Sequence, residues 1–511
     1  MGRKANTMKN LTMNVVSQFI TIICKFLTRT VFVYTLGKQY LGINGLFSNV
    51  ITMLSLAELG FGTAIVFNLY KPLAEKNKER IKALMQLYRK VYSIIGVVVF
   101  IIGILLIPFL GKLINGDTSF INIYFIFILY LLQSVSSYLF FAYKSALIKA
   151  DQKEYEIRGI SYITTLLSNL GQIIILLVFK NFSLYVASLI IFNVITNLAI
   201  AVKVDKVYPY LREKNVDKIS RSEIKGIFKD CYALLIYKVN GVVLNATDNM
   251  ILSSFIGLEI VGMYSNYLII VDNIKLIVKM VYNAITASVG NLHATVDTKY
   301  ENFIFRVLNL ATIWICGTAA VGVFIVANDL IQVWLGSEYL IAQEFCILLA
   351  INFYIWGLQM VLSTFRNAMG LFQQGKYRPL FGMVINIVTS IALVQRFGIY
   401  GVILGTIVSN MLTYMWYDPY IIHKYGFCMK VMSYYVNNIL YFGMICLSAV
   451  ICYFISTLFP DVNIAKIIIM SCVCAIVTSL ILFIFNFKKD EYKYLYNTGR
   501  CFLTKFVKKN K

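Results

Sequence analysis

Stretches of about 20 mostly apolar residues recur along almost the whole chain, and this recurrence limits the fold more than any other feature. A helix of about that length spans the hydrocarbon core of a bilayer. We count about fourteen such stretches in the 511 residues. They begin near Leu11, Gly42, Val91, Phe120, Glu156, Ser183, Phe228, Gly262, Phe303, Phe345, Pro379, Tyr400, Ser433 and Asn463. With 59% hydrophobic and only 14% charged residues, the sequence predicts an all-α, polytopic membrane protein with about 14 transmembrane helices.

The placement of the basic residues predicts the orientation of these helices. The formal net charge is +23, with 47 Lys and Arg against 24 Asp and Glu. If the N-terminus is cytoplasmic, most Lys and Arg fall in cytoplasmic segments, and those in outer loops are Lys38, Lys112, Lys180, Arg396 and Lys466. This asymmetry follows the positive-inside rule. We therefore predict a multi-pass protein of a bacterial cytoplasmic (inner) membrane with cytoplasmic N- and C-termini, whose basic loops contact membrane lipids and not nucleic acid.

A weak internal repeat divides the chain into two halves. The stretch LGKQYLG at residues 36–42 aligns with IGLEIVG at 256–262, and YKSALIKADQKEY at 143–155 aligns with FRNAMGLFQQGKY at 365–377. A repeat of this kind is typical of transporters with two pseudo-symmetric lobes. The predicted segments are an N-terminal six-helix lobe (1–203), a cytoplasmic basic linker (204–227), a C-terminal six-helix lobe (228–420), and a basic loop with helices 13 and 14 and a cytoplasmic tail (421–511).

Charged residues inside the predicted helices indicate a hydrated cavity between the lobes. The cations are Lys25, Arg29, Lys144, Lys238, Lys275, Lys279 and Arg366, and the acids are Glu58, Asp248 and Asp272. Each such charge costs about 2.5 to 3.5 kcal/mol at a helix centre, so ten lipid-facing charges would exceed the usual stability of a fold. The positive surplus favours an anionic cargo, because Lys and Arg are the usual partners of phosphate. The candidate substrate-binding residues are Lys25, Arg29, Lys144, Lys238, Lys275 and Arg366.

Structural roles compete with several of these assignments. Lys144 and Arg366 lie close to the cytoplasmic ends of their helices, where long side chains can extend to the interface. Glu58 has two interpretations, an ion-coupling residue or a structural partner for a cation of the first helix. Asp272 and Lys275 are three residues apart, so they have the spacing of a local ion pair.

Two blocks of the sequence carry a family resemblance. The stretch YLGINGLFSNVITMLSLAELGFGTAIVFNLYKPLAE at residues 40–75, together with TDNMILSSFIGLEIVGMYSNY and ITASVGNLHA within 247–294, resembles the Wzx-type polysaccharide flippases. These form the polysaccharide transporter group of the multidrug/oligosaccharidyl-lipid/polysaccharide exporter (MOP) superfamily. The resemblance covers most of the chain. It implies two six-helix lobes around a central cationic cavity.

The resemblance also implies a function and its partners. The expected cargo is an undecaprenyl-diphosphate-linked oligosaccharide, moved from the inner to the outer leaflet by alternating access and then used for capsule, exopolysaccharide or O-antigen. The expected partners are this lipid-linked glycan, membrane lipids and the polysaccharide polymerase machinery. No cofactor is expected apart from Na⁺ or H⁺ coupling, for which Asp248 is the first candidate and Glu58 and Asp272 are further cavity acids.

Other functions share some of these features. A flippase for lipid II or another diphosphate lipid would need the same cationic cavity. A multidrug exporter of the same superfamily usually carries cationic cargo, which a positive cavity would repel. A polymerase enzyme would need a large outer loop, but the longest outer loop, Asp329 to Gln343, is short. We therefore expect a transporter without catalytic residues. Because the chain has only His293 and His423, we also expect no histidine-rich metal centre.

Overall fold

The protein is almost entirely helical. The computed structural model describes residues 3–55, 61–115, 121–141, 143–151, 153–213, 219–225, 227, 246–371, 374–375 and 377–509. Within these ranges no β-strand occurs, which confirms the predicted all-α class. The described part contains nine helices that are long and apolar enough to cross a membrane, or ten if the bent pair α6 (Ile123–Leu139) and α7 (Lys144–Ala150) forms one span.

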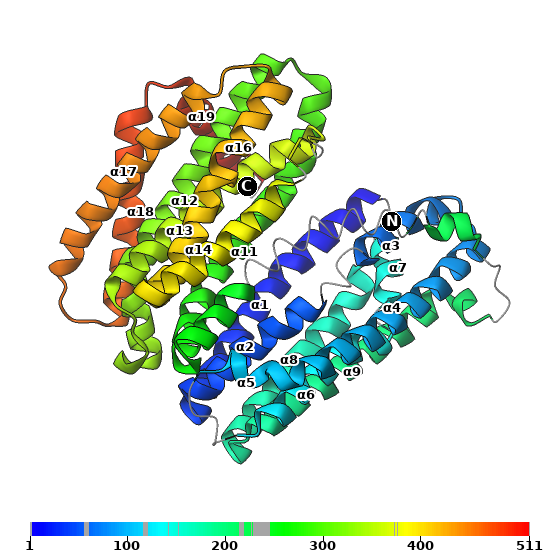
Figure 1. Ribbon diagram of the computed structural model, residues 1–511. Helices are drawn as coiled ribbons and strands as arrows, with labels where there is room; N and C mark the ends of the chain where they lie inside the picture. Colours follow the sequence, from blue (N-terminus) through cyan, green and yellow to red (C-terminus); the bar gives the residue numbers. More distant parts are fainter. Residues whose placement is uncertain are drawn as a thin grey trace. The chain divides into compact units, whose positions relative to one another are not determined.

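The chain forms two compact units, Met1–Gly262 and Met263–Lys511, here called the N-terminal and C-terminal units. Besides α6 and α7, the helices of the N-terminal unit are α1 (Arg3–Leu36), α2 (Lys38–Leu54), α3 (Phe61–Ala74), α4 (Lys78–Leu106), α5 (Leu110–Leu113), α8 (Tyr155–Phe179) and α9 (Phe182–Val207). Helix α8 packs against α1 and α9, and α6 packs against α4 and α9 (Figure 1). Asparagine side chains cap α4, α6 and α9 by accepting a hydrogen bond from a backbone N–H of the first turn.

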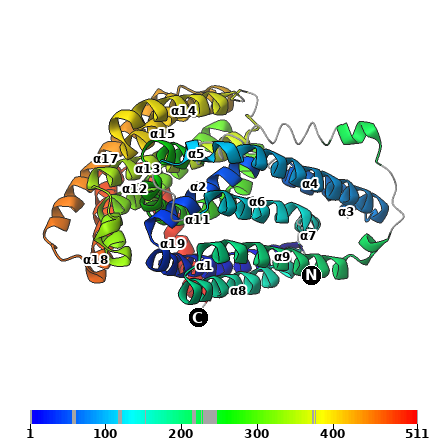
Figure 2. The same ribbon diagram turned by 60° about the horizontal axis from the view of Figure 1, so that its bottom comes forward.

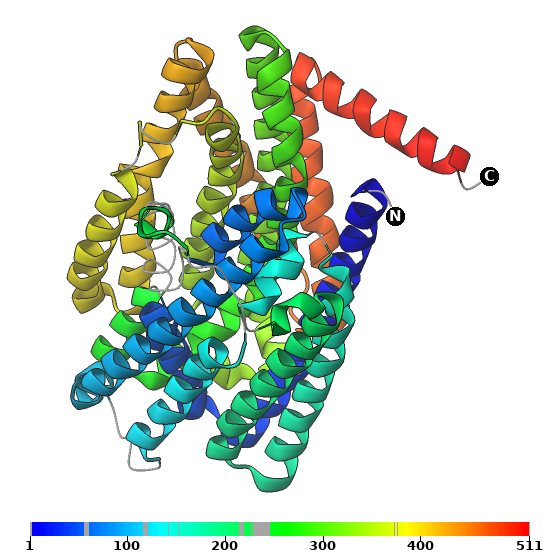
Figure 3. The same ribbon diagram turned by 90° about the vertical axis from the view of Figure 1, so that its right-hand side faces the viewer.

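The C-terminal unit is built around one long buried helix, α12 (Thr298–Leu335), which packs against α13 (Gln343–Ala368), α17 (Met432–Thr457) and α18 (Ile464–Asn486). The other helices of this unit are α11 (Leu258–Thr295), α14 (Arg378–Phe397), α15 (Ile399–Leu412), α16 (Tyr414–Ile421) and α19 (Asp490–Lys509). Figure 2 shows α14 and α15 side by side. Figure 3 shows α19 turned away from the axis of α18. Helices α17 and α18 correspond to the predicted helices 13 and 14.

The boundary between the units lies after Gly262, inside the continuous helix α11. The second lobe was instead predicted to begin at residue 228. Most of residues 226–245 lie outside the described residues, so the predicted linker and lobe boundaries stay predictions. The first turn of α11 belongs to the N-terminal unit because it packs there against the first turn of α2.

This packing is reciprocal between the two copies of the repeat. Gly37 and Gly257 immediately precede α2 and α11 and have φ values of 86° and 132°, a conformation that glycine adopts easily. One turn into each helix, Gly42 lies against the carbonyl oxygen of Leu258, and Gly262 lies against that of Lys38. Lys38 and Leu258 are themselves aligned in the repeat. Each copy therefore contributes one glycine and one backbone carbonyl at equivalent positions.

Candidate functional site

Two predicted site residues, Lys25 and Arg29, lie on α1. Lys25 is exposed and has no ion-pair partner among the described residues. Arg29 is half-buried and close enough to Tyr130 and Tyr185 to act on their hydroxyl groups electrostatically. Tyr130 in turn donates a hydrogen bond to the side-chain oxygen of Asn44 on α2. The positive charge of Arg29 therefore lies in a polar cluster formed by four helices.

One buried hydrogen bond joins α1 to α8. Thr28 is buried, and its hydroxyl donates to the side-chain oxygen of Asn169 on α8 at 2.8 Å. Because residues three and four apart share a helix face, Lys25 lies on the same side of α1 as Thr28 and Arg29. A polar contact of this kind between two packed helices stabilises their packing.

Lys144, another predicted substrate contact, has an acidic partner. Its Nζ donates to the two carboxylate oxygens of Asp205 on α9 at 2.6 and 2.8 Å. The side chains of Lys144 and Asp205 are only 13% and 19% exposed. The Nζ also lies 5.0 Å from the ring centroid of Phe141. The structure thus places Lys144 in a half-buried ion pair within the N-terminal unit.

Arg366, the repeat equivalent of Lys144, also has an acidic partner. Its Nη1 lies 3.4 Å from Oδ1 of Asp418 on α16, and Arg378 at the start of α14 forms a second ion pair with the same carboxylate. The guanidinium carbon of Arg378 lies 4.1 Å from the ring centroid of Tyr414. The side chains of Arg366, Arg378 and Asp418 are 10%, 5% and 3% exposed. The structure thus places Arg366 in a buried cluster of three charges within the C-terminal unit.

The two acids Asp205 and Asp418 were absent from the predicted site, and they change its charge balance. Both lie near the end of the last helix of their six-helix repeat, so they were not counted among the intramembrane charges. The sequence did contain a signal for these two residues, because each half has an aspartate near the end of its last helix. Each of the two cations has a carboxylate on a neighbouring helix, so neither extension to the interface nor contact with substrate is needed to account for it.

The second half presents a different group on α11 and α13. Lys275 and Lys279 are four residues apart on α11, and their Nζ atoms lie 5.8 and 5.7 Å from the ring centroid of Trp356. Lys275 also pairs with Asp272 at 3.3 Å, which is the local pair considered from the spacing. Lys279 is exposed and has no ion pair with any residue that the structure describes. Nothing in the sequence pointed to Trp356 except its place in an apolar helix.

Three further site predictions fall outside these groups. Glu58 and Lys238 lie outside the described residues. Asp248 is buried in the helical segment 246–255 of the N-terminal unit. The central cavity between the two lobes remains a prediction. The described part of the chain contains no group of His, Cys, Asp and Glu side chains that could hold a metal ion.

Comparisons with known proteins identify the fold. No protein-family profile matches the sequence, and no match to a curated protein sequence is found. Among solved structures, the lipid II flippase MurJ in an inward closed conformation matches with a TM-score of 0.66 and 14% identity, over 92% of this chain and 98% of that chain.

Two MATE transporters match over somewhat less of the chain. An inward-facing MATE family transporter of the MOP superfamily has a TM-score of 0.59 and 14% identity, over 78% of this chain and 94% of its own. A mutant of the Vibrio cholerae MATE transporter VcmN has a TM-score of 0.59 and 14% identity, over 84% of this chain and 98% of its own. The chain therefore has the fold of the polytopic transporters of the MOP superfamily.

Proposed function

We propose that this protein is a flippase that moves an undecaprenyl-diphosphate-linked oligosaccharide from the inner to the outer leaflet of a bacterial cytoplasmic membrane. The observation that carries the proposal is the fold shared with the lipid II flippase MurJ over 92% of the chain. The family resemblance of residues 40–75 and 247–294 supports, as the cargo, a lipid-linked oligosaccharide used in polysaccharide synthesis. In this proposal the protein acts by alternating access and has no catalytic residues.

In this proposal each unit offers cations to a phosphate group, those of α1 in the N-terminal unit and those of α11 in the C-terminal unit. Lys25 and Lys279 are exposed and have no ion pair with described residues, and Arg29 lies one helical turn after Lys25. Ammonium and guanidinium groups form short charge-assisted hydrogen bonds with phosphate oxygens. Lys275, although paired locally with Asp272, lies near the same tryptophan ring as Lys279. The ring of Trp356 would offer an apolar surface to the glycan.

Two of the predicted contacts take a structural role in this proposal. Lys144 and Arg366 are held by Asp205 and Asp418, so binding a phosphate would require breaking a buried or half-buried ion pair. Lys238 stays a proposed substrate contact. Coupling to Na⁺ or H⁺ through Asp248, with Glu58 and Asp272 as further acids, also stays part of the proposal.

A second candidate is a flippase for lipid II. The likeness to MurJ covers more of this chain than the likeness to either of the two MATE transporters, and its TM-score is higher. Lipid II shares the undecaprenyl diphosphate, so the same cations would serve it. A multidrug exporter is disfavoured because Lys25 and Lys279 would repel cationic cargo.

The proposal is tested by locating the lipid-linked oligosaccharide in cells with and without the protein. A membrane-impermeant glycosidase is applied to intact protoplasts, and the cleaved fraction of the lipid-linked glycan is measured. We expect the lipid to accumulate protected from the enzyme when the protein is absent, and to become accessible when the protein is restored. Unchanged accessibility without accumulation would exclude this cargo. Accumulation of lipid II instead would select the second candidate.

Charge-reversal variants test the assigned contacts in the same cells. We expect Lys25→Glu and Lys279→Glu to lower the rate of translocation at least about tenfold, because a repelled phosphate loses at least one charge-assisted hydrogen bond. The matched control is Arg396→Glu, which reverses an exposed cation near the end of α14. Normal rates in the α1 and α11 variants, at normal expression, would show that these lysines do not bind the cargo.

A further inference from the structure

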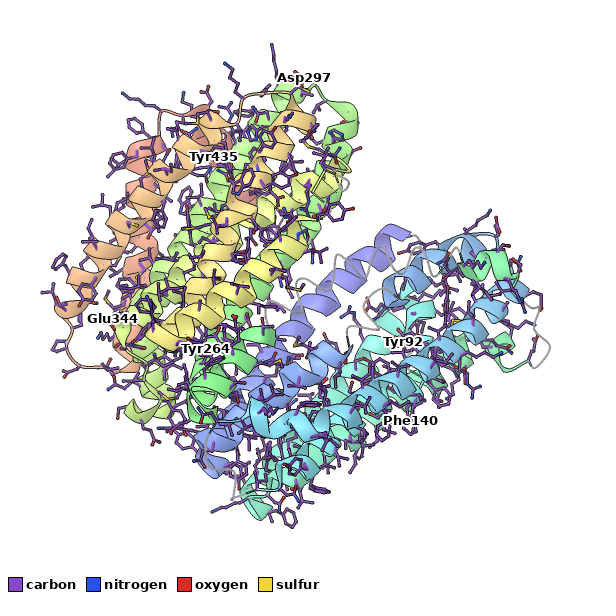
Figure 4. The ribbon with its side chains drawn as sticks, in the orientation of Figure 1. Tyr92, Phe140, Tyr264, Asp297, Glu344 and Tyr435 are labelled. Atoms are coloured by element: carbon purple, nitrogen blue, oxygen red, sulfur yellow. The ribbon has the colours of Figure 1, made fainter. Side chains whose placement is uncertain are left out.

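The C-terminal unit contains a polar cavity that the proposed transport function does not use. Its volume is about 280 Å³, and it lies between the first turns of α12, the segment before α17, the first turns of α17, and the junction of α18 and α19. Figure 4 shows Asp297 and Tyr435 toward this end of the unit and Glu344 toward the opposite end. Polar and charged side chains that line the cavity include Asn302, Arg306, Asn309, Lys430, Lys489 and Glu491.

The cavity carries a surplus of positive charge. Arg306 is balanced by Glu491, whose Oε1 lies 2.9 Å from its Nη1. Lys430 and Lys489 also line the cavity, and neither forms an ion pair with a described residue. The Nζ of Lys489 lies 3.3 Å from the hydroxyl of Tyr441 and 4.8 Å from its ring centroid. Burial lowers the pKa of Lys489, and the nearby Glu491 opposes that effect. An anion in the cavity would stabilise the charged form of Lys489.

The same cavity contains acceptors that need donors. The side-chain oxygens of Asn302 and Asn309 are buried, and no donor among the described residues lies within hydrogen-bond distance of them. The amide nitrogen of Asn302 donates to the sulfur of Met429 at 3.1 Å. The amide nitrogen of Asn309 donates to the side-chain oxygen of Asn438 at 3.4 Å. Buried acceptors are almost always satisfied in folded proteins. Because these two oxygens have almost no accessible surface, a ligand would reach them only when the amides turn toward the cavity, and it would then have to bring hydroxyl groups as well as negative charge.

We propose that this cavity binds the phosphate ester of a small polyol, with the phosphate on Lys430 and Lys489 and, once the amides of Asn302 and Asn309 turn toward the cavity, the hydroxyl groups on their side-chain oxygens. The volume lies just below the range of about 300 to 1,000 Å³ for drug-sized ligands, so it suits one headgroup and excludes an oligosaccharide. The chemistry is that of glycerol phosphate, either free or as the headgroup of phosphatidylglycerol. Basic pockets between helices on the cytoplasmic side of a membrane bind anionic headgroups in this way.

Lipid retention by the purified full-length protein tests the site. The protein is exchanged into detergent with equal amounts of phosphatidylglycerol, phosphatidylmethanol and phosphatidylethanolamine, and bound lipids are counted by native mass spectrometry. We expect phosphatidylglycerol to be retained about tenfold more than phosphatidylethanolamine, and the preference to disappear in Lys430→Gln/Lys489→Gln. The matched control Lys488→Gln changes an exposed neighbour outside the cavity and should keep the preference.

Other outcomes separate the two kinds of contact and the two sources of ligand. Equal retention of phosphatidylmethanol and phosphatidylglycerol would overturn the hydroxyl contacts, because phosphatidylmethanol has the same charge but no hydroxyl group in its headgroup. Displacement of the retained lipid by millimolar glycerol 3-phosphate would support the same site with a free ligand as its source. If the double variant fails to fold, Lys430→Gln and Lys489→Gln are tested separately, and an undiminished preference in both single variants would overturn the phosphate contact. Transport defects do not enter this test, so it is independent of the proposed function.

Discussion

The repeat-equivalent cations Lys144 and Arg366 both pair with an aspartate, but the two ion pairs differ in composition and in burial. In the N-terminal unit, one lysine and one aspartate form a single pair whose side chains are 13% and 19% exposed. In the C-terminal unit, two arginines share the carboxylate of Asp418, and all three side chains are 10% exposed or less. Both halves keep an ion pair between corresponding helices, but only the second has buried it.

This difference shows that the repeat preserves the place of a charge and not its surroundings. A half-buried pair such as Lys144 and Asp205 retains part of its hydration, so its loss costs less than the loss of a fully buried pair. A buried carboxylate that holds two guanidinium groups has lost its hydration, so its removal leaves uncompensated buried charge. The glycines that precede and begin α2 and α11 are the opposite case, because there the two copies make the same contacts with each other.

Removing the acid of each ion pair should cause the largest losses of stability, and the losses should differ most between the two halves. We expect Asp418→Ala to lower the free energy of unfolding by about 3 to 5 kcal/mol, because it leaves two buried arginines without their carboxylate. For Asp205→Ala we expect a loss of only about 1 to 2 kcal/mol, between the values for exposed and buried pairs. Denaturant unfolding in detergent micelles measures both. Equal losses would show that burial does not distinguish the two pairs.

Substitution of Gly42 or of Gly262 should lower the stability by similar amounts, whereas removal of the two acids should not. A Cβ at position 42 or 262 would overlap a backbone carbonyl of the other copy, of Leu258 or of Lys38. We expect Gly42→Ala and Gly262→Ala each to cost about 1 to 3 kcal/mol, the usual range for overpacking. The control is Gly111→Ala, where an added Cβ meets nothing. A loss in only one of the two variants would argue against a reciprocal contact.

Exchanging the acid and the base within each ion pair should give the smallest change in stability, and it tests whether the two pairs differ. We expect Lys144→Asp/Asp205→Lys to recover most of the roughly 1 to 2 kcal/mol lost in Asp205→Ala, since a single pair can be reversed. The exchange Arg366→Asp/Asp418→Arg should recover little, because the arginine introduced at position 418 would face Arg378. Both double variants are compared with their single variants in a mutant cycle. Recovery in the second pair would contradict the role given to Arg378.

Much of the fold was predictable because membrane helices are recognised by their length and hydropathy. The described helices follow the order of the predicted stretches, from α1 to α18. The seventh stretch, from Phe228, lies mostly outside the described residues. The breaks within spans were not predicted. One example is the bend between α6 and α7, which leaves no mark in the composition of the segment.

The candidate site was less predictable, because a charge in a helix does not reveal its partner. The spacing identified Asp272 and Lys275, whose pairing is local along one helix. Asp205 and Asp418 pair over many residues of sequence, so only the packing of helices brings them to Lys144 and Arg366. For the same reason, no pattern in the sequence connects Trp356 with Lys279, although the two side chains are neighbours in the folded chain.

The most direct test of the central claim is translocation by the purified protein in liposomes. Undecaprenyl-diphosphate-linked oligosaccharide is distributed over both leaflets, and a membrane-impermeant glycosidase is added outside. We predict that cleavage stops at the outer-leaflet portion in empty liposomes and proceeds toward completion with the protein present, but not with Lys25→Glu/Lys279→Glu. Cleavage that stops at the outer-leaflet portion in both cases, with correctly folded protein, would contradict the flippase account.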